Sequence, residues 1–318
     1  MRRIRPVVAP TLALLLLSVA GCGGSSKSPF PGYAAPGNTS ASTAPSSSPS
    51  SSTGPLALPS PNPGLVAEVP ASVAKAGTLH VGTDTSYAPS EFLGEDGKTA
   101  EGFDIDLFRA VAAELGLKTD FISAPFDNII PGVLSGKYDV GVSSFTINAD
   151  RMKKATMVSY FSAGMQWATR SGNPAGVSLD DACGKHIAVQ TATTEVDDLT
   201  ARSKKCTDAG KSAISIDQFQ NQDEATAAAV SGKDDAMSAD SPVIAYAIKQ
   251  SGGRLAALGD AFGTAPYGYV LKLSATDLGK AISDAVNELM ANGQYRQILE
   301  HWGVGAGAIS GSKVNPTP

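Results

Sequence analysis

Residues 138–151 read Tyr-Asp-Val-Gly-Val-Ser-Ser-Phe-Thr-Ile-Asn-Ala-Asp-Arg, an apolar strand pattern followed at once by polar side chains. These side chains are Ser143, Ser144, Thr146 and Arg151. The run 138–142 predicts a buried strand, and ligands of open α/β sheets bind beyond the carboxyl ends of their strands. A guanidinium matches a carboxylate with two parallel hydrogen bonds, and hydroxyls can donate to the remaining lone pairs. The stretch therefore indicates a carboxylate site, but a plain strand-to-helix turn with Thr146 or Asn148 as N-cap also fits.

On both sides of this stretch, strand and helix patterns alternate along the chain. Further strands are expected at residues 79–82, 119–122, 186–190, 213–216 and 235–239. Helices are expected at residues 108–115, 129–134, 194–202, 223–231, 277–291 and 295–302. Such alternation predicts an α/β fold with mostly parallel sheets flanked by helices. Because the alternation occurs in two similar sets, we expect two lobes.

The amino terminus has the pattern of an export signal. Basic residues precede an apolar run at residues 7–19, which is too short and interrupted to suggest a membrane-spanning helix. The run ends in Val-Ala-Gly-Cys, which resembles the lipobox of bacterial lipoproteins and would place a lipid on Cys22. The alternative is a plain secretory signal with an incidental cysteine. Either interpretation predicts a protein that works outside the cytoplasm.

The composition of the rest of the chain predicts flexible segments on either side of a globular part. Residues 23–68 are dominated by Ser, Pro, Gly, Ala and Thr, which predicts a disordered tether, and residues 310–318 are expected to form a flexible tail. The formal charge is −5, and it becomes −8 without the three arginines of the signal, which argues against nucleic acid as a partner. No cofactor is expected.

The two cysteines of the globular part, Cys183 and Cys206, are expected to form a disulfide, because export leads to an oxidising compartment. Two free buried thiols are the alternative. The three histidines lie far apart in the sequence, and neither cysteine has a His or Cys neighbour at metal-binding spacing. We therefore predict no metal site.

From about residue 78 to residue 302, the chain resembles the type 3 extracellular solute-binding proteins, which deliver polar amino acids to ABC importers. Five ordered blocks support this resemblance: Val-Gly-Thr-Asp-Thr-Ser-Tyr-Ala-Pro at 81–89, Gly-Phe-Asp-Ile-Asp-Leu at 102–107, Ile-Pro-Gly-Val-Leu-Ser-Gly-Lys-Tyr-Asp at 130–139, Asp-Ser-Pro at 240–242 and Asn-Gly-Gln-Tyr at 292–295.

The resemblance implies a periplasmic-binding-protein clamshell whose two lobes close over the ligand. Lobe 1 would comprise residues 69–168 and 266–309, and lobe 2 residues 169–265, with crossovers near 167–169 and 265–267. The implied partners are a free amino acid, the membrane subunits of an ABC permease and, through Cys22, the membrane itself. A monomer without enzymatic activity is expected.

Site residues follow from the resemblance by position. The ligand carboxylate would contact Arg151, Ser144, Thr146, Ser143, Thr193 and Thr194. The amino group would contact Asp240, and the ligand side chain Asp84, Tyr87, Ser90 and Phe126. Simpler roles stay open: the threonines or Asp240 could cap helices, the two aromatic residues could belong to the core, and Asp84 could brace its loop.

The chain departs from the family at two of these places. Ser90 stands where relatives usually have Phe, which suggests a more polar ligand. Ala192 stands where Gly is usual, so its Cβ could hold a ligand carboxylate further from the backbone. Two other functions remain possible on this fold: a catalytic relative resembling cyclohexadienyl dehydratase, and the ligand-sensing module of a signalling system.

Overall fold

The structure is a computed structural model that describes residues 56–317 of the chain. The predicted signal peptide, Cys22 and residues 23–55 of the predicted tether lie outside the described residues. Among the residues that are described, no helix is both long enough and apolar enough to cross a membrane.

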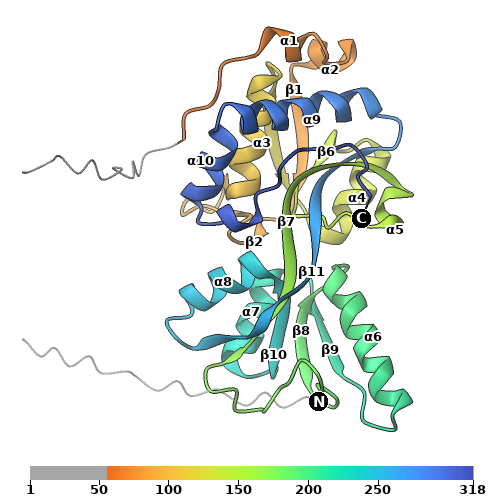
Figure 1. The fold of residues 1–318 in the computed structure, drawn as a ribbon, viewed down its shortest axis with the longest axis vertical. Coiled ribbons are helices and arrows are strands. Elements are labelled where there is room, and N and C mark those ends of the chain that lie inside the picture. Colours follow the sequence, from red (N-terminus) through yellow and green to blue (C-terminus); the bar gives the residue numbers. More distant parts are fainter. Residues whose placement is uncertain (1–55, 318) are drawn as a thin grey trace, which may run out of the picture. The chain divides into compact units, whose positions relative to one another are not determined.

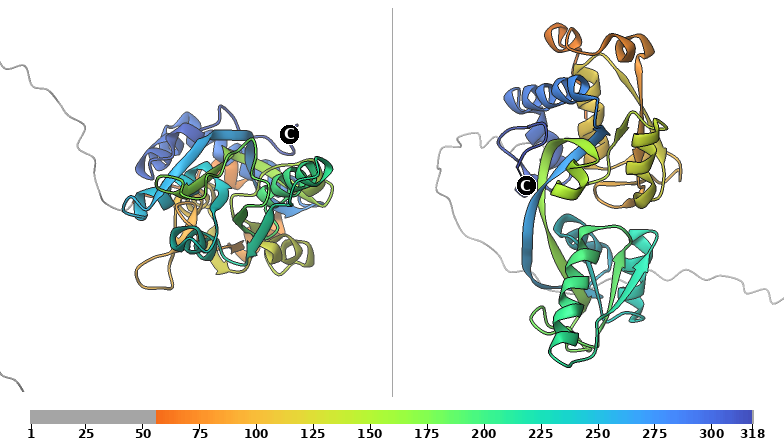
Figure 2. Two further views of the ribbon diagram at one scale, coloured as in Figure 1. Left: turned by 90° about the horizontal axis from the view of Figure 1, so that it is seen from below. Right: turned by 90° about the vertical axis from the view of Figure 1, so that its right-hand side faces the viewer.

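Within the described residues, one eight-stranded sheet continues through both lobes (Figures 1 and 2). Its strands in spatial order are β5 (Lys118–Ser123), β1 (Thr78–Thr83), β6 (Val140–Gly141), β11 (Leu255–Lys272), β7 (Ala155–Arg170), β10 (Ala236–Asp240), β8 (His186–Gln190) and β9 (Ser215–Phe219). β1 is parallel to β5 and β6 in lobe 1, and β8 is parallel to β9 and β10 in lobe 2. The predicted two-lobed α/β fold is confirmed.

Helices flank this sheet in each lobe. Lobe 1 contains α1 (Pro63–Val66), α2 (Ala71–Ala76), α3 (Phe103–Glu114), α4 (Phe126–Ser135), α5 (Ala149–Met152), α9 (Thr276–Ala291), α10 (Gln294–His301) and the 3-10 turn η1 (Gly305–Gly307). Lobe 2 contains α6 (Thr194–Asp208), α7 (Gln222–Ser231) and α8 (Ser241–Gln250). A small sheet of β2 (Ser86–Tyr87), β3 (Glu91–Leu93) and β4 (Ala100–Glu101) adjoins α3.

The apolar stripe that predicted a helix at 108–115 is the buried face of α3. Phe108, Val111 and Leu115 are at most 1% exposed, and Gly116 ends the helix with a left-handed φ of 67°. The helix begins earlier than expected, at Phe103. The other predicted helices are confirmed, although α6 continues beyond residue 202 to 208. Strand β9 begins two residues later than expected, and β6 keeps only two residues of its predicted run.

The chain passes between the lobes in the antiparallel strands β7 and β11 (Figure 1). Ala163 pairs with Ala265, whereas Met165 already pairs with β10 of lobe 2. The register between β7 and β11 shifts between Phe262 and Ala265, an irregularity at which strands bend. The outgoing crossover therefore lies near residues 163–165, a few residues before the predicted 167–169. Gly164 lies at this crossover, yet β7 runs through it without a break.

Two segments predicted to be flexible are packed against lobe 1, so the predictions for residues 56–68 and 310–317 are wrong. Leu65 is 9% exposed and belongs to the core of lobe 1, and the Asn62 amide donates to the last carbonyl of α3 at 2.9 Å. At the other end, the Asn315 amide donates to β7 at 2.7 Å. The prediction for residues 56–68 rested on average composition, which does not reveal the few apolar side chains that pack against lobe 1. The second covers the outer edge of β7 in lobe 1.

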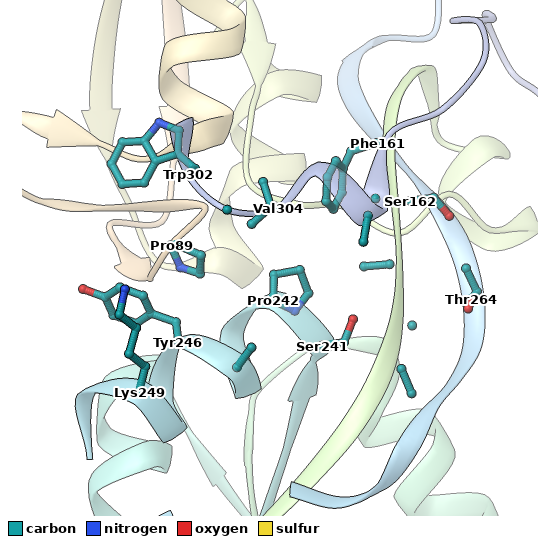
Figure 3. A pocket seen from close by; sticks show the side chains of 17 residues that line it. Pro89, Phe161, Ser162, Ser241, Pro242, Tyr246, Lys249, Thr264, Trp302 and Val304 are labelled. Carbon is teal, nitrogen blue, oxygen red and sulfur yellow. The ribbon is translucent and has the colours of Figure 1, made fainter. Parts of the chain in front are cut away.

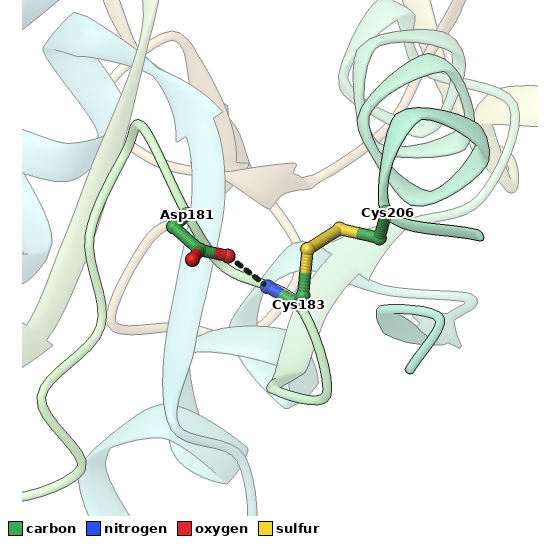
Figure 4. A group of neighbouring side chains, drawn as sticks. All are labelled: Asp181, Cys183 and Cys206. Carbon is green, nitrogen blue, oxygen red and sulfur yellow. Dashed lines mark hydrogen bonds between the residues drawn. A yellow bond between two sulfur atoms is a disulfide. The ribbon is translucent and has the colours of Figure 1, made fainter. Parts of the chain in front are cut away.

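The predicted disulfide between Cys183 and Cys206 is present (Figure 4). It joins the segment before β8 to the last turn of α6, and the backbone amide of Cys183 donates to the carboxylate of Asp181 at 3.3 Å. Both sulfur atoms are therefore bonded to each other and are not available as thiolates.

Replacing both cysteines with serine is expected to lower the free energy of unfolding by about 3 kcal/mol, since the link removes chain entropy from the unfolded state. The two cysteines are 23 positions apart in the sequence. Urea unfolding of the double variant Cys183→Ser/Cys206→Ser and of the oxidised parent measures this difference. An unchanged unfolding midpoint would show that the link adds nothing to stability.

Candidate functional site

Most predicted site residues meet between the lobes, beyond the carboxyl ends of β1, β6, β8 and β10. They surround a cavity of about 10 Å³, which is room for about one water molecule. Its lining residues are Tyr87, Phe126, Ser143, Ser144, Thr146, Arg151, Thr193, Thr194, Glu195 and Asp240. Because the space is so small, a whole amino acid could enter only after the lobes move apart.

Arg151 points from α5 into this space. Asn148 caps α5 by accepting the Arg151 amide at 2.8 Å, so capping and a ligand role coexist in one segment. The guanidinium donates from Nη1 to the carbonyl of Thr146 at 2.9 Å and from Nη2 to that of Ala192 at 3.3 Å. The second bond crosses the cleft to lobe 2. No carboxylate of the described residues lies within 4 Å of the guanidinium, and burial lowers the pKa of Arg151.

Two aromatic rings lie beside this guanidinium. Its central carbon lies 5.5 Å from the ring centres of both Phe126 and Phe145, within the range of cation–π attraction. The two rings stack on each other with centres 4.7 Å apart. Phe126 therefore contacts the arginine, while its predicted role as an aromatic wall for the ligand stays a prediction.

The hydroxyls of Ser143 and Ser144 bond to acids inside lobe 1. Ser143 Oγ donates to Glu91 at 2.7 Å and accepts the amide of Asp84 at 3.1 Å. The amide and the hydroxyl of Ser144 both donate to Asp104 Oδ2, at 2.8 and 3.2 Å. Sequence reasoning missed this buried acidic layer, in which burial raises the pKa of Asp104 to about 6. The predicted contact of these serines with a ligand stays a prediction.

Three threonines line the cavity from both lobes. Thr146 Oγ1 of lobe 1 lies 3.4 Å from Thr194 Oγ1 at the start of α6. Thr193 precedes α6 but makes no side-chain cap bond, because its hydroxyl donates to the carbonyl of Gln190 at 2.8 Å. Ala192 before them has a left-handed φ of 62°, a conformation that favours glycine. The turn thus keeps the backbone shape of a glycine turn despite its Cβ.

Glu195 lines the cavity but was not predicted as a site residue. Its side chain comes from the first turn of α6 and is only 1% exposed. Burial and the neighbouring Asp240 raise the pKa of Glu195 to about 8. In the sequence this acid fitted a favourable interaction with the helix dipole. The available signal was its position directly after the two predicted threonines.

Asp240 faces the cavity from the carboxyl end of β10. Its Oδ2 accepts the Tyr87 hydroxyl at 2.9 Å, a bond that joins the lobes. Asp240 occupies the N-cap position of α8, yet its side chain makes no cap bond. Burial raises the pKa of Asp240 to about 6.

Asp84 and Ser90 do not line the cavity. Asp84 braces its loop by accepting the Ser86 amide at 3.1 Å and the Ser86 hydroxyl at 2.8 Å. It also accepts the side-chain amide of Gln190 in lobe 2, a partner that sequence reasoning missed. Ser90 is fully buried beside the loop. A role of either in recognising the ligand side chain stays a prediction.

A larger cavity of about 470 Å³ lies elsewhere between the lobes (Figure 3). Tyr246 and Pro242 of α8 face Pro89 and Trp302 of lobe 1 across it. No predicted ligand residue lines this cavity. It therefore differs from the polar site around Arg151.

Comparisons with known proteins show which family the chain resembles. Residues 79–305 match the family described as bacterial extracellular solute-binding proteins, family 3. The arginine-binding protein ArgT of Corynebacterium glutamicum is 35% identical over 262 residues, which cover 82% of this chain and 86% of that protein.

Two solved structures are similar as well. One is an ancestral arginine-binding protein bound to arginine, with 35% identity, a TM-score of 0.66, and coverage of 71% of this chain and 98% of that one. The other is the ancestral amino acid-binding protein AncCDT-1, a precursor of cyclohexadienyl dehydratase. It has 31% identity, a TM-score of 0.66, and coverage of 73% and 97%.

Proposed function

Because the chain belongs to family 3 of the bacterial extracellular solute-binding proteins, we propose that it binds a free cationic amino acid, arginine foremost, and delivers it to an ABC importer. The observation that supports the cationic ligand is the second buried acid, Glu195, beside Asp240. A zwitterionic amino acid offers one positive group to the site. A ligand with a cationic side chain offers two, one for each acid.

Arg151 would bind the ligand carboxylate, since its planar fork matches a carboxylate and no acid of the described residues pairs with it. Thr146, Thr193 and Thr194 would complete this part of the site, and the amino terminus of α6 favours an anion there. Asp240 would hold the α-ammonium group. Glu195 would hold the second positive charge, and the linked side chains of Asp84 and Gln190 would close the far end of the cleft.

Ligand binding would favour lobe closure. Arg151 lies on lobe 1, whereas the threonines of α6 and both cavity acids lie on lobe 2, so only the closed form makes all contacts at once. This difference in affinity shifts the population from open to closed. The closed form would be the one that the permease recognises.

The protein would act outside the cytoplasm as a monomer, held to the membrane by a lipid on Cys22. Family membership supports export, and the lipobox-like sequence before Cys22 supports the anchor. Metabolic labelling with a fatty-acid analogue should modify the parent chain, and a Cys22→Ser variant should remain unlabelled.

A thermal-shift screen tests the ligand class, because a ligand that binds only the native state raises the unfolding temperature. Arginine and lysine are expected to raise it most, glutamine less, and glutamate least. A screen in which glutamate or an apolar amino acid gave the largest shift would contradict the cationic assignment.

One observation favours a second function, that of a cyclohexadienyl dehydratase. A cleft carboxyl group such as Glu195, whose pKa is raised to about 8, could serve as a general acid. One structural neighbour is described as a precursor of that enzyme. Turnover of prephenate or arogenate would support the enzyme, whereas stoichiometric arginine binding without turnover supports the carrier.

A further inference from the structure

Lobe 2 contains a second group of ionisable side chains, at the end of its sheet opposite the amino-acid site. It consists of His186, the first residue of β8, Asp217 in β9, and Asp234, shortly before β10 (strands in Figure 1). One nitrogen or oxygen atom of each lies within 4.8 Å of the others. The fold brings them together from distant positions, which is why the scattered histidines gave no metal-binding pattern in the sequence.

Asp234 is the unusual member of this group. It is 0% exposed, and neither of its carboxylate oxygens has a hydrogen-bond donor among the described residues. The ammonium group of the adjacent Lys233 lies 4.6 Å from the ring centre of Phe219. Lys233 makes no ion pair with Asp234. Burying a carboxylate without a partner is costly, so a positive partner is expected at this position.

Lobe 1 provides an internal comparison for this site. Ser-Gly-Lys-Tyr-Asp at 135–139 and Ser-Gly-Lys-Asp-Asp at 231–235 precede the central strands of the two lobes. In both, the last aspartate accepts the backbone amide of a histidine that lies in the neighbouring strand: Asp139 from His80 at 2.8 Å, and Asp235 from His186 at 3.0 Å. The residue before it is the buried Tyr138 in lobe 1 but Asp234 in lobe 2. Lobe 2 thus has an acid where lobe 1 has an aromatic ring.

The other two side chains of the group are partly exposed to solvent. His186 Nδ1 lies 3.4 Å from Asp217 Oδ2, and their side chains are 56% and 33% exposed. Ser215 donates to the other oxygen of Asp217 at 3.2 Å, which orients the carboxylate. Two carboxylates and a neutral imidazole together carry two negative charges, which a divalent ion would balance.

We propose that His186 Nδ1, Asp217 and Asp234 bind a divalent transition-metal ion, Zn²⁺ being the best match, with water completing its coordination. Imidazole nitrogen and carboxylate oxygen are both ordinary zinc ligands. The ion would link β8, β9 and the turn before β10 on the side of lobe 2 that faces away from the amino-acid site. It would therefore stabilise lobe 2 without contacting the amino-acid ligand.

A proton is the competing occupant. Burial and the neighbouring carboxylate of Asp217 raise the pKa of Asp234 to about 7, so a proton shared between the two carboxyl groups could also satisfy them. Zinc would have to displace that proton. Zinc titration distinguishes the two occupants.

The experiment is calorimetric titration of ZnCl₂ into the chelator-treated full chain, with thermal unfolding in parallel. We expect one equivalent to bind and to raise the unfolding temperature. His186→Ala is expected to weaken zinc binding by at least about tenfold. The matched control is His80→Ala, because His80 is the lobe 1 counterpart, is also 56% exposed and pairs with Asp139 at 3.3 Å.

Asp234→Asn provides a second test that keeps the size of the side chain. It should also weaken zinc binding by at least about tenfold, while arginine affinity stays unchanged. The proposal is overturned if zinc neither binds nor shifts the unfolding temperature, or if His80→Ala and His186→Ala weaken binding equally. If the parent chain does not bind arginine, the proposed function is contradicted, but the zinc proposal is not.

Discussion

Replacing Arg151 with alanine is expected to weaken the binding of every amino-acid ligand by about 2 kcal/mol or more, which is about 30-fold in affinity. The reason is that the ligand carboxylate would stay buried at closure with no guanidinium beside it. The loss should be similar for arginine and for glutamine, because both carry the same carboxylate. Calorimetry with both ligands measures it.

Two further variants separate recognition from folding. Arg151→Lys keeps the charge but loses the planar fork, so it should retain only part of the affinity. Arg296→Ala is the matched control, since its side chain is 67% exposed on α10 and lies outside the site. Unchanged affinity in a folded Arg151→Ala protein would refute the carboxylate assignment.

Replacing Glu195 with glutamine should selectively weaken arginine binding. The change keeps the shape of the side chain but removes the charge that we assign to the cationic end of the ligand. Removing one partner of a buried charge pair costs about 2–5 kcal/mol, whereas glutamine binding should be unchanged or improved. Asp197→Asn is the matched control, because Asp197 lies on the same helix but is exposed.

The same residue predicts how ligand preference depends on pH. In the closed form, burial raises the pKa of Glu195 from its ordinary value of 4.5 to about 8. A neutral ligand does not offset this effect, so Glu195 takes up a proton when the lobes close over such a ligand. Affinity for glutamine is then greatest below the ordinary pKa and is lost as the pH rises towards 8. A cationic ligand supplies the positive charge itself, so its affinity should not fall in this way.

The preference for arginine over glutamine should therefore widen as the pH rises through this window, and Glu195→Gln should abolish the change. Calorimetry in buffers with different ionisation enthalpies counts the protons taken up. Proton uptake that is equal for both ligands would place Glu195 away from the ligand charge.

The repeated strand and helix patterns predicted the two-lobed fold because each lobe forms its own αβ sets. The long strands β7 and β11 were not predicted. Their middle parts lack the regular alternation of a half-buried strand. The lobe boundary lies inside them, beside Gly164 and Gly263, where a glycine predicts a turn but neither strand ends. The packed segments at residues 56–68 and 310–317 were also missed, since composition is an average and a few well-placed side chains decide packing.

Arg151 and Asp240 were predicted from residue types with one obvious chemistry, and both line the cavity between the lobes, while their contacts with a ligand stay predictions. Prediction of the site failed where a simpler explanation was sufficient. Glu195 appeared to be explained by the helix dipole, and the acids behind Ser143 and Ser144 become visible only when α3 and β3 pack beside the loop. Such contacts depend on tertiary neighbours that no local pattern contains.

The pairing of Ala163 with Ala265 has a practical meaning for engineering. The chain leaves lobe 1 and returns to it at neighbouring positions. Lobe 2 is therefore an insertion into lobe 1, and the two ends of this insertion are already adjacent. A short turn could close either lobe as a separate polypeptide, and a lobe 2 from another binding protein could be exchanged as a cassette. The ligand preference assigned to α6 and β10 could then be transplanted without redesigning the rest of the molecule.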